Sequence, residues 1–255
     1  MLEVHQFMCR SDNFGILLRD SRSGATALID APEERPILRA IQQTGWQPPS
    51  LLLVTHHHMD HVEANLALKE RFGLTIVGPA KEAEKIPGID RSVREGDSVR
   101  VGQQEATVIE TPGHTAGHVS YYFEKAGILF TADTLFALGC GRLFECKPPV
   151  MYESLKKIAS LPLETVIYCG HEYTASNARF ALTIDPTNSA LKERAKKIDS
   201  LVREGKPTLP TSLGEEMATN PFLRWHDPAI RRNLNMSGAS DEAVFAEIRK
   251  RKDIS

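Results

Sequence analysis

Short apolar or alternating runs recur along the first two thirds of the chain, and their length and β-branched or aromatic content predict strands. They lie at Ala27–Ile29, Leu51–Val54, Leu74–Val77, Ala106–Ile109, Val119–Phe123, Ile128–Phe130 and Thr165–Tyr168. Two connections instead carry apolar residues at helical spacing: residues 33–44, which stop before Gly45, and residues 62–72, which stop before Gly73. Strands with interspersed helices predict a layered α/β domain.

The pattern changes after about residue 171. Residues 188–204 place apolar side chains on one helical face and end at Gly205, and residues 240–250 form a second such segment with Ser240 as N-cap. We therefore expect a smaller, helical C-terminal domain. The predicted division is a catalytic domain over residues 1–172 and a helical domain over residues 173–255.

The composition is that of a soluble globular protein: 255 residues, 41% hydrophobic, 25% charged and a net charge of −2. That charge predicts no nucleic-acid partner, although 13 Lys or Arg against 10 Asp or Glu from Ser189 onward leave a local excess of +3. We expect no signal peptide and no membrane span. Four cysteines without a CxxC pair predict reduced thiols in the cytoplasm.

Histidines and aspartates come shortly after four of the predicted strands. The first group is THHHMDH (residues 55–61), after Leu51–Val54. The others stand in TPGHTAGH, FTADT and CGHEY. In a layered α/β fold such strand ends open on one edge, where sites are usually built. The candidate ligands are therefore His56, His58, Asp60, His61, His114, Asp133 and His171.

Imidazole and carboxylate without a cysteine ligand suit zinc, iron or manganese in a site with open positions. Seven ligands are too many for one ion but suit two, with one carboxylate bridging. A metal pair activates water and polarises a carbonyl, so we expect hydrolysis of an ester, thioester, amide or phosphoester. His57 alternates away from its neighbours and is expected to support the ligands, and His5, His118 and His226 are expected to be structural.

These motifs resemble the metal-binding signature of the metallo-β-lactamase superfamily. GCGRLFE (139–145), HEYT, NPFLR and the closing RKRKD resemble, within it, the glyoxalase II (hydroxyacylglutathione hydrolase) family over essentially the whole chain. The resemblance implies a four-layer αββα sandwich followed by a helical domain that covers the active site. It implies one metal on His56, His58 and His114, a second on Asp60, His61 and His171, and Asp133 with a hydroxide between them. Asp60 would also orient that hydroxide.

The reaction implied is hydrolysis of S-D-lactoylglutathione to glutathione and D-lactate, the second step of methylglyoxal detoxification. The resemblance also implies the residues of the glutathione site, which are Arg142, Phe144, Tyr173, Arg249 and Lys252. Some members have tyrosine in place of Phe144 and lysine in place of Arg142. The missing hydroxyl removes one possible polar contact and predicts weaker affinity for glutathione conjugates.

The sequence leaves two alternatives open. A persulfide dioxygenase of the same superfamily would use a single iron and consume oxygen. A non-catalytic metal-binding scaffold would keep the fold, although such proteins usually lose ligands and here all seven positions are occupied. A β-lactamase normally carries a secretion signal, and a nuclease has a larger basic surface. We expect two divalent ions per chain, with zinc favoured over iron or manganese, and a monomer.

Overall fold

The computed structural model describes all residues from Met1 to Ser255, which divide into two compact units. Unit 1 comprises residues 1–111 and 116–131, and unit 2 comprises residues 112–115 and 132–255. The chain passes from unit 1 into unit 2 for the second time at Ala132, which is the last residue of a strand. No helix is both long and apolar enough to span a bilayer.

Unit 1 contains two sheets. The first has the strand order β1-β2-β3-β4-β5-β6, antiparallel from β1 to β3 and parallel from β3 onward, and the second runs β10-β9-β8-β7. The strands are β1 (Leu2–Cys9), β2 (Asn13–Asp20), β3 (Thr26–Ile29), β4 (Leu51–Leu53), β5 (Thr75–Pro79), β6 (Arg91–Val93), β7 (Ser98–Val101), β8 (Gln104–Glu110), β9 (Val119–Phe123) and β10 (Ile128–Ala132).

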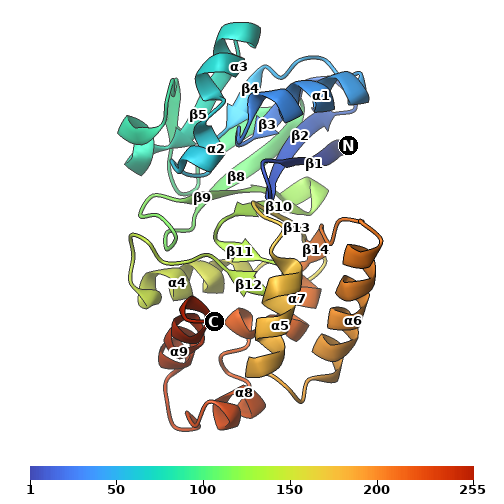
Figure 1. Cartoon of the computed structure of the whole chain (residues 1–255). Coiled ribbons are helices and arrows are strands. Elements are labelled where there is room, and N and C mark those ends of the chain that lie inside the picture. Colours follow the sequence, from blue (N-terminus) through green and yellow to red (C-terminus); the bar gives the residue numbers. More distant parts are fainter. The chain divides into compact units, whose positions relative to one another are not determined.

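Helices cover one face of the first sheet in unit 1. Helix α1 (Glu34–Thr44) packs on β1 and β2, and α3 (Asn65–Phe72) packs on β5 (Figure 1). Their apolar sides enclose a core with Leu17, Leu28 and Leu52 of the sheet. The remaining elements are the single turn α2 (Met59–Val62) and the 3-10 turns η1 (Ala80–Lys85) and η2 (Glu124–Ala126). Gly45 and Gly73 end α1 and α3 in the left-handed region at φ 64°, as predicted.

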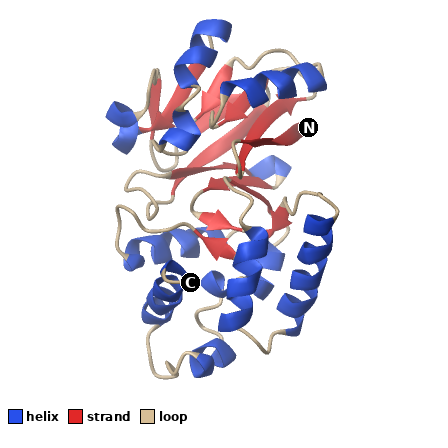
Figure 2. Cartoon of the chain, in the orientation of Figure 1, coloured by secondary structure: helices blue, strands red, loops and turns tan.

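Unit 2 is mainly helical, as expected for the C-terminal third (Figure 2). Two short antiparallel pairs, β11 with β12 and β13 with β14, accompany the helices. The elements are β11 (Leu135–Phe136), β12 (Gly139–Cys140), α4 (Pro148–Ala159), β13 (Val166–Cys169), α5 (Thr174–Ile184), α6 (Ser189–Arg203), β14 (Thr211–Ser212), α7 (Leu213–Thr219), η3 (Pro221–Leu223), α8 (Pro228–Asn233) and α9 (Asp241–Asp253). Ser240 caps α9 by accepting the Ala243 N–H, as predicted.

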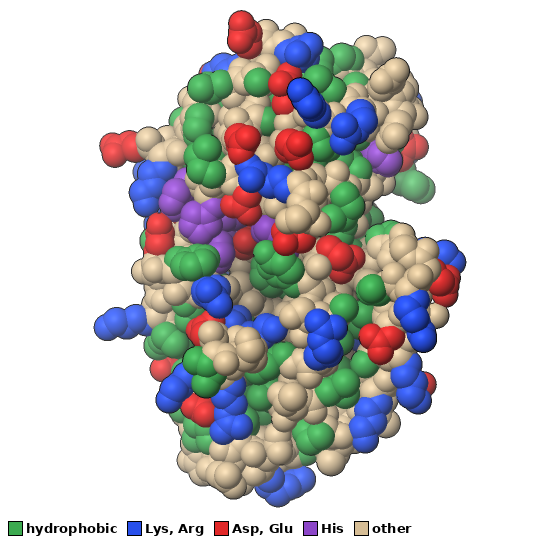
Figure 3. Space-filling view, in the orientation of Figure 1, with side chains coloured by type: hydrophobic (Ala, Val, Ile, Leu, Met, Phe, Trp, Pro, Cys, Tyr) green, Lys and Arg blue, Asp and Glu red, His purple; other side chains and the backbone are tan.

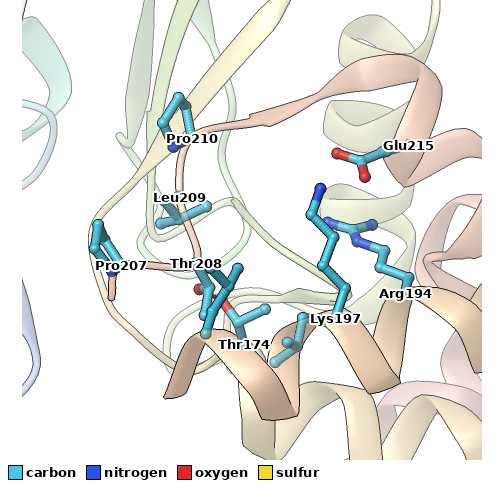
Figure 4. Close-up of a pocket in the computed structure, with 10 residues that line it drawn as sticks. Thr174, Arg194, Lys197, Pro207, Thr208, Leu209, Pro210 and Glu215 are labelled. Carbon is cyan, nitrogen blue, oxygen red and sulfur yellow. Dashed lines mark hydrogen bonds between the residues drawn. The ribbon is translucent and has the colours of Figure 1, made fainter. Parts of the chain in front are cut away.

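A buried ion pair ties α6 to α7 in unit 2. The guanidinium of Arg194 bonds the Glu216 carboxylate, and Glu216 is fully buried. Arg194 also lines a cavity of about 140 Å³ between α6 and residues 207–210, with Lys197 beside it and Glu215 opposite (Figure 4). The exposed side of α6 carries Lys192, Lys196, Lys197 and Arg203, and Lys and Arg side chains are visible on the surface of the molecule (blue in Figure 3). The charged pair inside and the apolar contacts with α5 hold α6 in place.

Candidate metal centre

The THHHMDH segment links β4 to α2 in unit 1. His58 is the N-cap residue of α2 and has extended backbone angles, so Asp60 and His61 stand on the first helical turn, as predicted. The His56 ring lies 4.8 Å from that of His58 and 4.1 Å from that of His61, measured between centroids. His56 and His61 are buried, whereas His58 is partly exposed. Histidine side chains are visible at the surface as purple atoms in Figure 3.

Asp30 fixes the orientation of two of these imidazoles. Its carboxylate accepts hydrogen bonds from the Thr55 N–H, the Thr55 hydroxyl and His61 Nδ1, each at 2.8 Å. Because the Thr55 hydroxyl gives its proton to Asp30, its oxygen accepts from His56 Nδ1 at 3.0 Å. Both rings therefore carry their proton on Nδ1 and present an unprotonated Nε2, which is the metal-binding form.

Asp60 and His57 are held by residues that the sequence reasoning did not identify. Asn13 donates to both the carbonyl and the carboxylate of Asp60, at 3.1 Å. The buried Glu82 accepts from His57 N–H and Nδ1 at 2.8 Å, and from Gly117 N–H at 2.8 Å. His57 thus fastens the motif to η1, consistent with the supporting role expected for it.

The histidines expected to be structural lie apart from the ligand positions or support them. His118 is buried, lies 3.0 Å from the Thr111 hydroxyl through Nδ1 and stacks on His56 at 4.9 Å. His5 stacks on Phe7 in β1, and burial lowers the pKa of its imidazole. His226 is exposed.

The three remaining candidate ligands meet in unit 2. The Asp133 Oδ2 atom lies 3.4 Å from His114 Nε2 and 3.3 Å from His171 Nε2, and all three residues are buried. Asp133 directly follows β10 and His171 lies two residues after β13, while His114 belongs to the short segment 112–115. His114 Nδ1 donates to the Arg142 carbonyl at 2.8 Å, so Nε2 is again the unprotonated nitrogen.

The distances between these atoms fit a metal. Two ligand atoms at about 2.1 Å from one ion, at a tetrahedral angle, lie about 3.4 Å apart. The two Asp133 separations match that value, and in unit 1 the Asp60 Oδ2 atom lies 3.7 Å from His61 Nε2. Without a cation, buried carboxylates and neutral imidazoles at such distances would be poorly compensated. Each unit therefore contains part of a donor set that suits a divalent ion.

The predicted glutathione-site residues all lie in unit 2. Phe144 is 62% exposed and stands edge-on to His114 at 5.2 Å, and Tyr173 is 37% exposed and stacks on His171 at 4.8 Å. Arg142 is exposed and lies 3.6 Å from the Asp253 carboxylate. Lys252 lies over the Phe180 ring at 5.1 Å. Arg249 differs from the others because it is buried, with 4% of its surface exposed.

Replacing Asp30 with asparagine is expected to lower metal affinity by about 10–100-fold, the usual loss when a ligand's supporting partner is removed. An amide has one oxygen in place of two, so either the Thr55 N–H or both the Thr55 hydroxyl and His61 Nδ1 would face an NH₂ group that cannot accept a hydrogen bond. Chelator competition measures the affinity. Asp199→Asn, on the exposed side of α6, is the matched control. Unchanged affinity in Asp30→Asn would contradict this role.

Comparison with known proteins identifies the class of fold. The metallo-beta-lactamase superfamily matches residues 15–171, and the hydroxyacylglutathione hydrolase C-terminus matches residues 172–255. The crystal structure of ETHE1 from Myxococcus xanthus superposes with a TM-score of 0.71 at 27% identity, over 99% of this chain and 92% of that one. TTHA1623 in a di-iron-bound form gives 0.64 at 26% identity, over 86% and 100%. The predicted α/β metallo-β-lactamase fold with a helical C-terminal region is thereby confirmed.

Relatives along the whole chain narrow the class to a family. A hydroxyacylglutathione hydrolase of Chelativorans sp. (strain BNC1) is 80% identical over 99% of both chains, and one of Mesorhizobium japonicum is 69% identical over 99% of this chain and 98% of that one. The chain belongs to the hydroxyacylglutathione hydrolase family, which confirms the resemblance seen in its motifs. The two family matches meet between residues 171 and 172, whereas the compact units part at Ala132, so the predicted domain boundary stays a prediction.

Proposed function

We propose that the chain hydrolyses S-D-lactoylglutathione to glutathione and D-lactate at a centre of two metal ions. As a member of the hydroxyacylglutathione hydrolase family the chain is a thioester hydrolase, and the observation that carries this conclusion is 80% identity over its full length to a relative of that name. The persulfide dioxygenase and the non-catalytic scaffold are not favoured by any of these relatives. The donor set implies divalent metal.

The proposed centre uses all seven candidate ligands. One ion would be held by His56, His58 and His114, the other by Asp60, His61 and His171, and Asp133 would be shared. The fixed Nε2 atoms and the close approach of Asp133 to His114 and His171 support this set. So does the di-iron form of TTHA1623, which is 26% identical. Zinc is the metal we propose, because neutral imidazoles and carboxylates bind it well.

The mechanism we propose assigns each residue a separate task. Metal bound at this centre supplies an activated water and polarises the thioester carbonyl. Asp60, held at both its carbonyl and its carboxylate by Asn13, orients that water as a hydrogen-bond acceptor. Asp30 keeps His56 and His61 in a single tautomer throughout the cycle, so neither ring takes up the water's proton.

The substrate side of the site is proposed to lie in unit 2. Lys252 has no carboxylate partner within the chain, and its neighbours are the cations Arg249 and Arg179. Arg249 pairs with Asp253, so Lys252 and Arg179 carry the positive charge that no carboxylate balances, and this charge suits an anionic ligand such as a glutathione carboxylate. Tyr173 would offer its hydroxyl to the peptide backbone of glutathione, Arg142 would lie near the thioester, and the exposed ring of Phe144 would cover the acyl group.

The charge of Lys252 predicts a pH dependence of KM. Burial, followed by Arg249 and Arg179, lowers the pKa of the Lys252 ammonium below its ordinary value of about 10.4. As pH rises through that lowered pKa the ammonium is lost and carboxylate binding weakens, so KM should rise at a lower pH than an ordinary lysine would give, while kcat changes little. Lys252→Arg should remove this rise, because arginine stays charged, and Lys252→Met should give a high, flat KM. A KM that is independent of pH in the wild type would contradict the assignment.

Release of thiol from S-D-lactoylglutathione tests the proposed substrate. We expect turnover of this thioester with free glutathione appearing in step with D-lactate and no uptake of oxygen. Simple carboxylic esters and β-lactams are the comparison substrates. Oxygen consumption with a glutathione persulfide, in the absence of thioester hydrolysis, would support the alternative with one iron. We further propose a monomer in a reducing cytoplasm, in keeping with four free cysteines.

A further inference from the structure

Arg249 of α9 is a buried cation with its hydrogen bonds directed inward. Its Nη1 donates to the Cys140 carbonyl at 2.8 Å and its Nη2 lies 2.9 Å from the Asp253 carboxylate. The guanidinium covers the Phe222 ring at 5.2 Å, and the remaining donor, Nε, is buried and makes no hydrogen bond. The donors that could meet an incoming carboxylate are therefore occupied or enclosed. Lys252, one turn further along, has no such engagement.

The carbonyl that Arg249 holds belongs to a short segment beside two of the proposed ligands. We call residues 139–142 the glycine segment, and each of its residues makes a backbone hydrogen bond. The carbonyls of Gly139, Cys140 and Arg142 accept from Asn220, Arg249 and His114, respectively. The Gly141 N–H donates to the Thr134 carbonyl. A carbonyl two residues after that of Cys140 is thus the partner of His114 Nδ1.

Gly141 shows how closely the segment is fitted to the ligands. A Cβ atom on this residue would lie 1.9 Å from the Asp133 carbonyl oxygen and 3.3 Å from His114 Cβ. Backbone cannot yield as a flexible side chain does, so the segment lies directly against Asp133 and His114. A displacement of the segment by a few tenths of an ångström must therefore shift one or both of these residues.

We propose that Arg249 is a positioning residue for the metal centre, acting through the glycine segment on His114 and Asp133. This inference rests on the proposed function, since it assumes that these two residues bind metal. It gives α9 a second task besides the carboxylate site at Lys252. The C-terminal helix would hold the carbonyl that sets the position and tautomer of one ligand. Losing Arg249 would then weaken metal binding even without substrate.

Metal affinity without substrate separates this role from direct substrate binding. Arg249→Met should lower affinity for Zn²⁺, measured by chelator competition, about tenfold, the low end for a supporting residue. Arg249→Lys should fall between, because one ammonium can reach the Cys140 carbonyl but cannot also bond Asp253. The control is Arg251→Met on the same helix, since Arg251 pairs only with Glu247 near the surface. Lys252→Met should raise KM and leave metal affinity unchanged.

A second measurement reports the ligand geometry directly. Cobalt-substituted wild-type protein, Arg249→Lys and Arg251→Met should be compared by visible absorption, and we expect a changed ligand-field spectrum in the Arg249 variant alone. Wild-type spectrum and affinity in both Arg249 variants, with only KM raised, would overturn the inference and leave Arg249 as a substrate contact. If the wild type itself bound no metal, the proposed function would fail instead. If Arg249→Met does not fold, the metal affinity and cobalt spectrum of Arg249→Lys decide whether Arg249 positions the metal ligands.

Discussion

Asp133→Ala is expected to abolish thioester hydrolysis, with kcat reduced at least about 10³-fold and the fold retained. The loss should exceed the 10–100-fold typical of supporting residues, because Asp133 is proposed to bind both ions. Its Oδ2 lies 3.3 Å and 3.4 Å from the Nε2 atoms of His171 and His114, so its loss removes the carboxylate that lies close to both imidazoles. His171→Ala should behave in the same way through loss of one ion.

Three measurements on the same preparation test this expectation. Turnover of S-D-lactoylglutathione gives kcat, elemental analysis gives metal per chain, and thermal unfolding shows whether the fold is retained. His226→Ala is the matched control, because His226 is exposed and outside the candidate ligands. Unchanged kcat in either Asp133→Ala or His171→Ala would reject the assignment. A variant with full metal content but no activity would confine Asp133 to a role in catalysis and contradict its role as a ligand.

Glu216→Ala is expected to lower the free energy of unfolding by about 3–5 kcal/mol, the cost of leaving a buried charge without its partner. Glu216 is fully buried, and its carboxylate bonds the Arg194 guanidinium and accepts from the Thr211 hydroxyl at 2.8 Å. It also accepts from the Leu138 N–H at 2.8 Å and from Asn220 at 3.0 Å. Alanine would leave the Leu138 N–H without an acceptor and the buried Arg194 guanidinium without its counter-charge, although Arg194 and Asn220 keep their other hydrogen bonds.

Urea unfolding measures this effect, and two further variants isolate its cause. Glu215→Ala removes the neighbouring exposed carboxylate and should change stability by less than about 1 kcal/mol. Glu216→Gln keeps an acceptor but removes the charge, so it should fall between the wild type and Glu216→Ala. A loss below about 1 kcal/mol for Glu216→Ala would show that Arg194 finds water or another partner, for example through the adjoining cavity.

The strand ends that carry the candidate ligands were predictable because each combines a short apolar run with a ligand-type residue. Val119–Phe123 is buried at every position, so its apolar character is continuous and its limits match β9. The hairpin of β1 and β2 was missed. In β1 most positions are only partly buried, and LEVHQFMC mixes polar and apolar residues without strict alternation. Helix α4 was also missed, whereas α5 lies within residues 173–255, which were predicted to be a helical domain.

Of the residues that support the ligands, Asp30 was predictable from the sequence and Glu82 was not. Asp30 directly follows the predicted strand Ala27–Ile29, so the rule that selected Asp133 could have selected it too. Glu82 could not be found in this way. It lies in η1, 25 positions from His57, and only the folded chain brings the two together. Long-range hydrogen bonds of this kind leave no local pattern.

The helical spacing of α9 already indicated that Arg249 is buried. It follows Phe245 by four residues on α9, and Phe245 and Ile248 are fully buried, so helical spacing places Arg249 on the apolar face. The family resemblance predicts that Arg249 binds a glutathione carboxylate, and this stays a prediction. A buried arginine can still serve the site, but through the backbone that it holds.

The most direct test of the central claim is metal content measured together with S-D-lactoylglutathione hydrolysis on the same preparations. Preparations that differ in metal content should show activity that is absent without metal and reaches its maximum at two ions per chain. Full hydrolytic activity at one ion per chain, or activity independent of metal content, would contradict a centre built from all seven ligands.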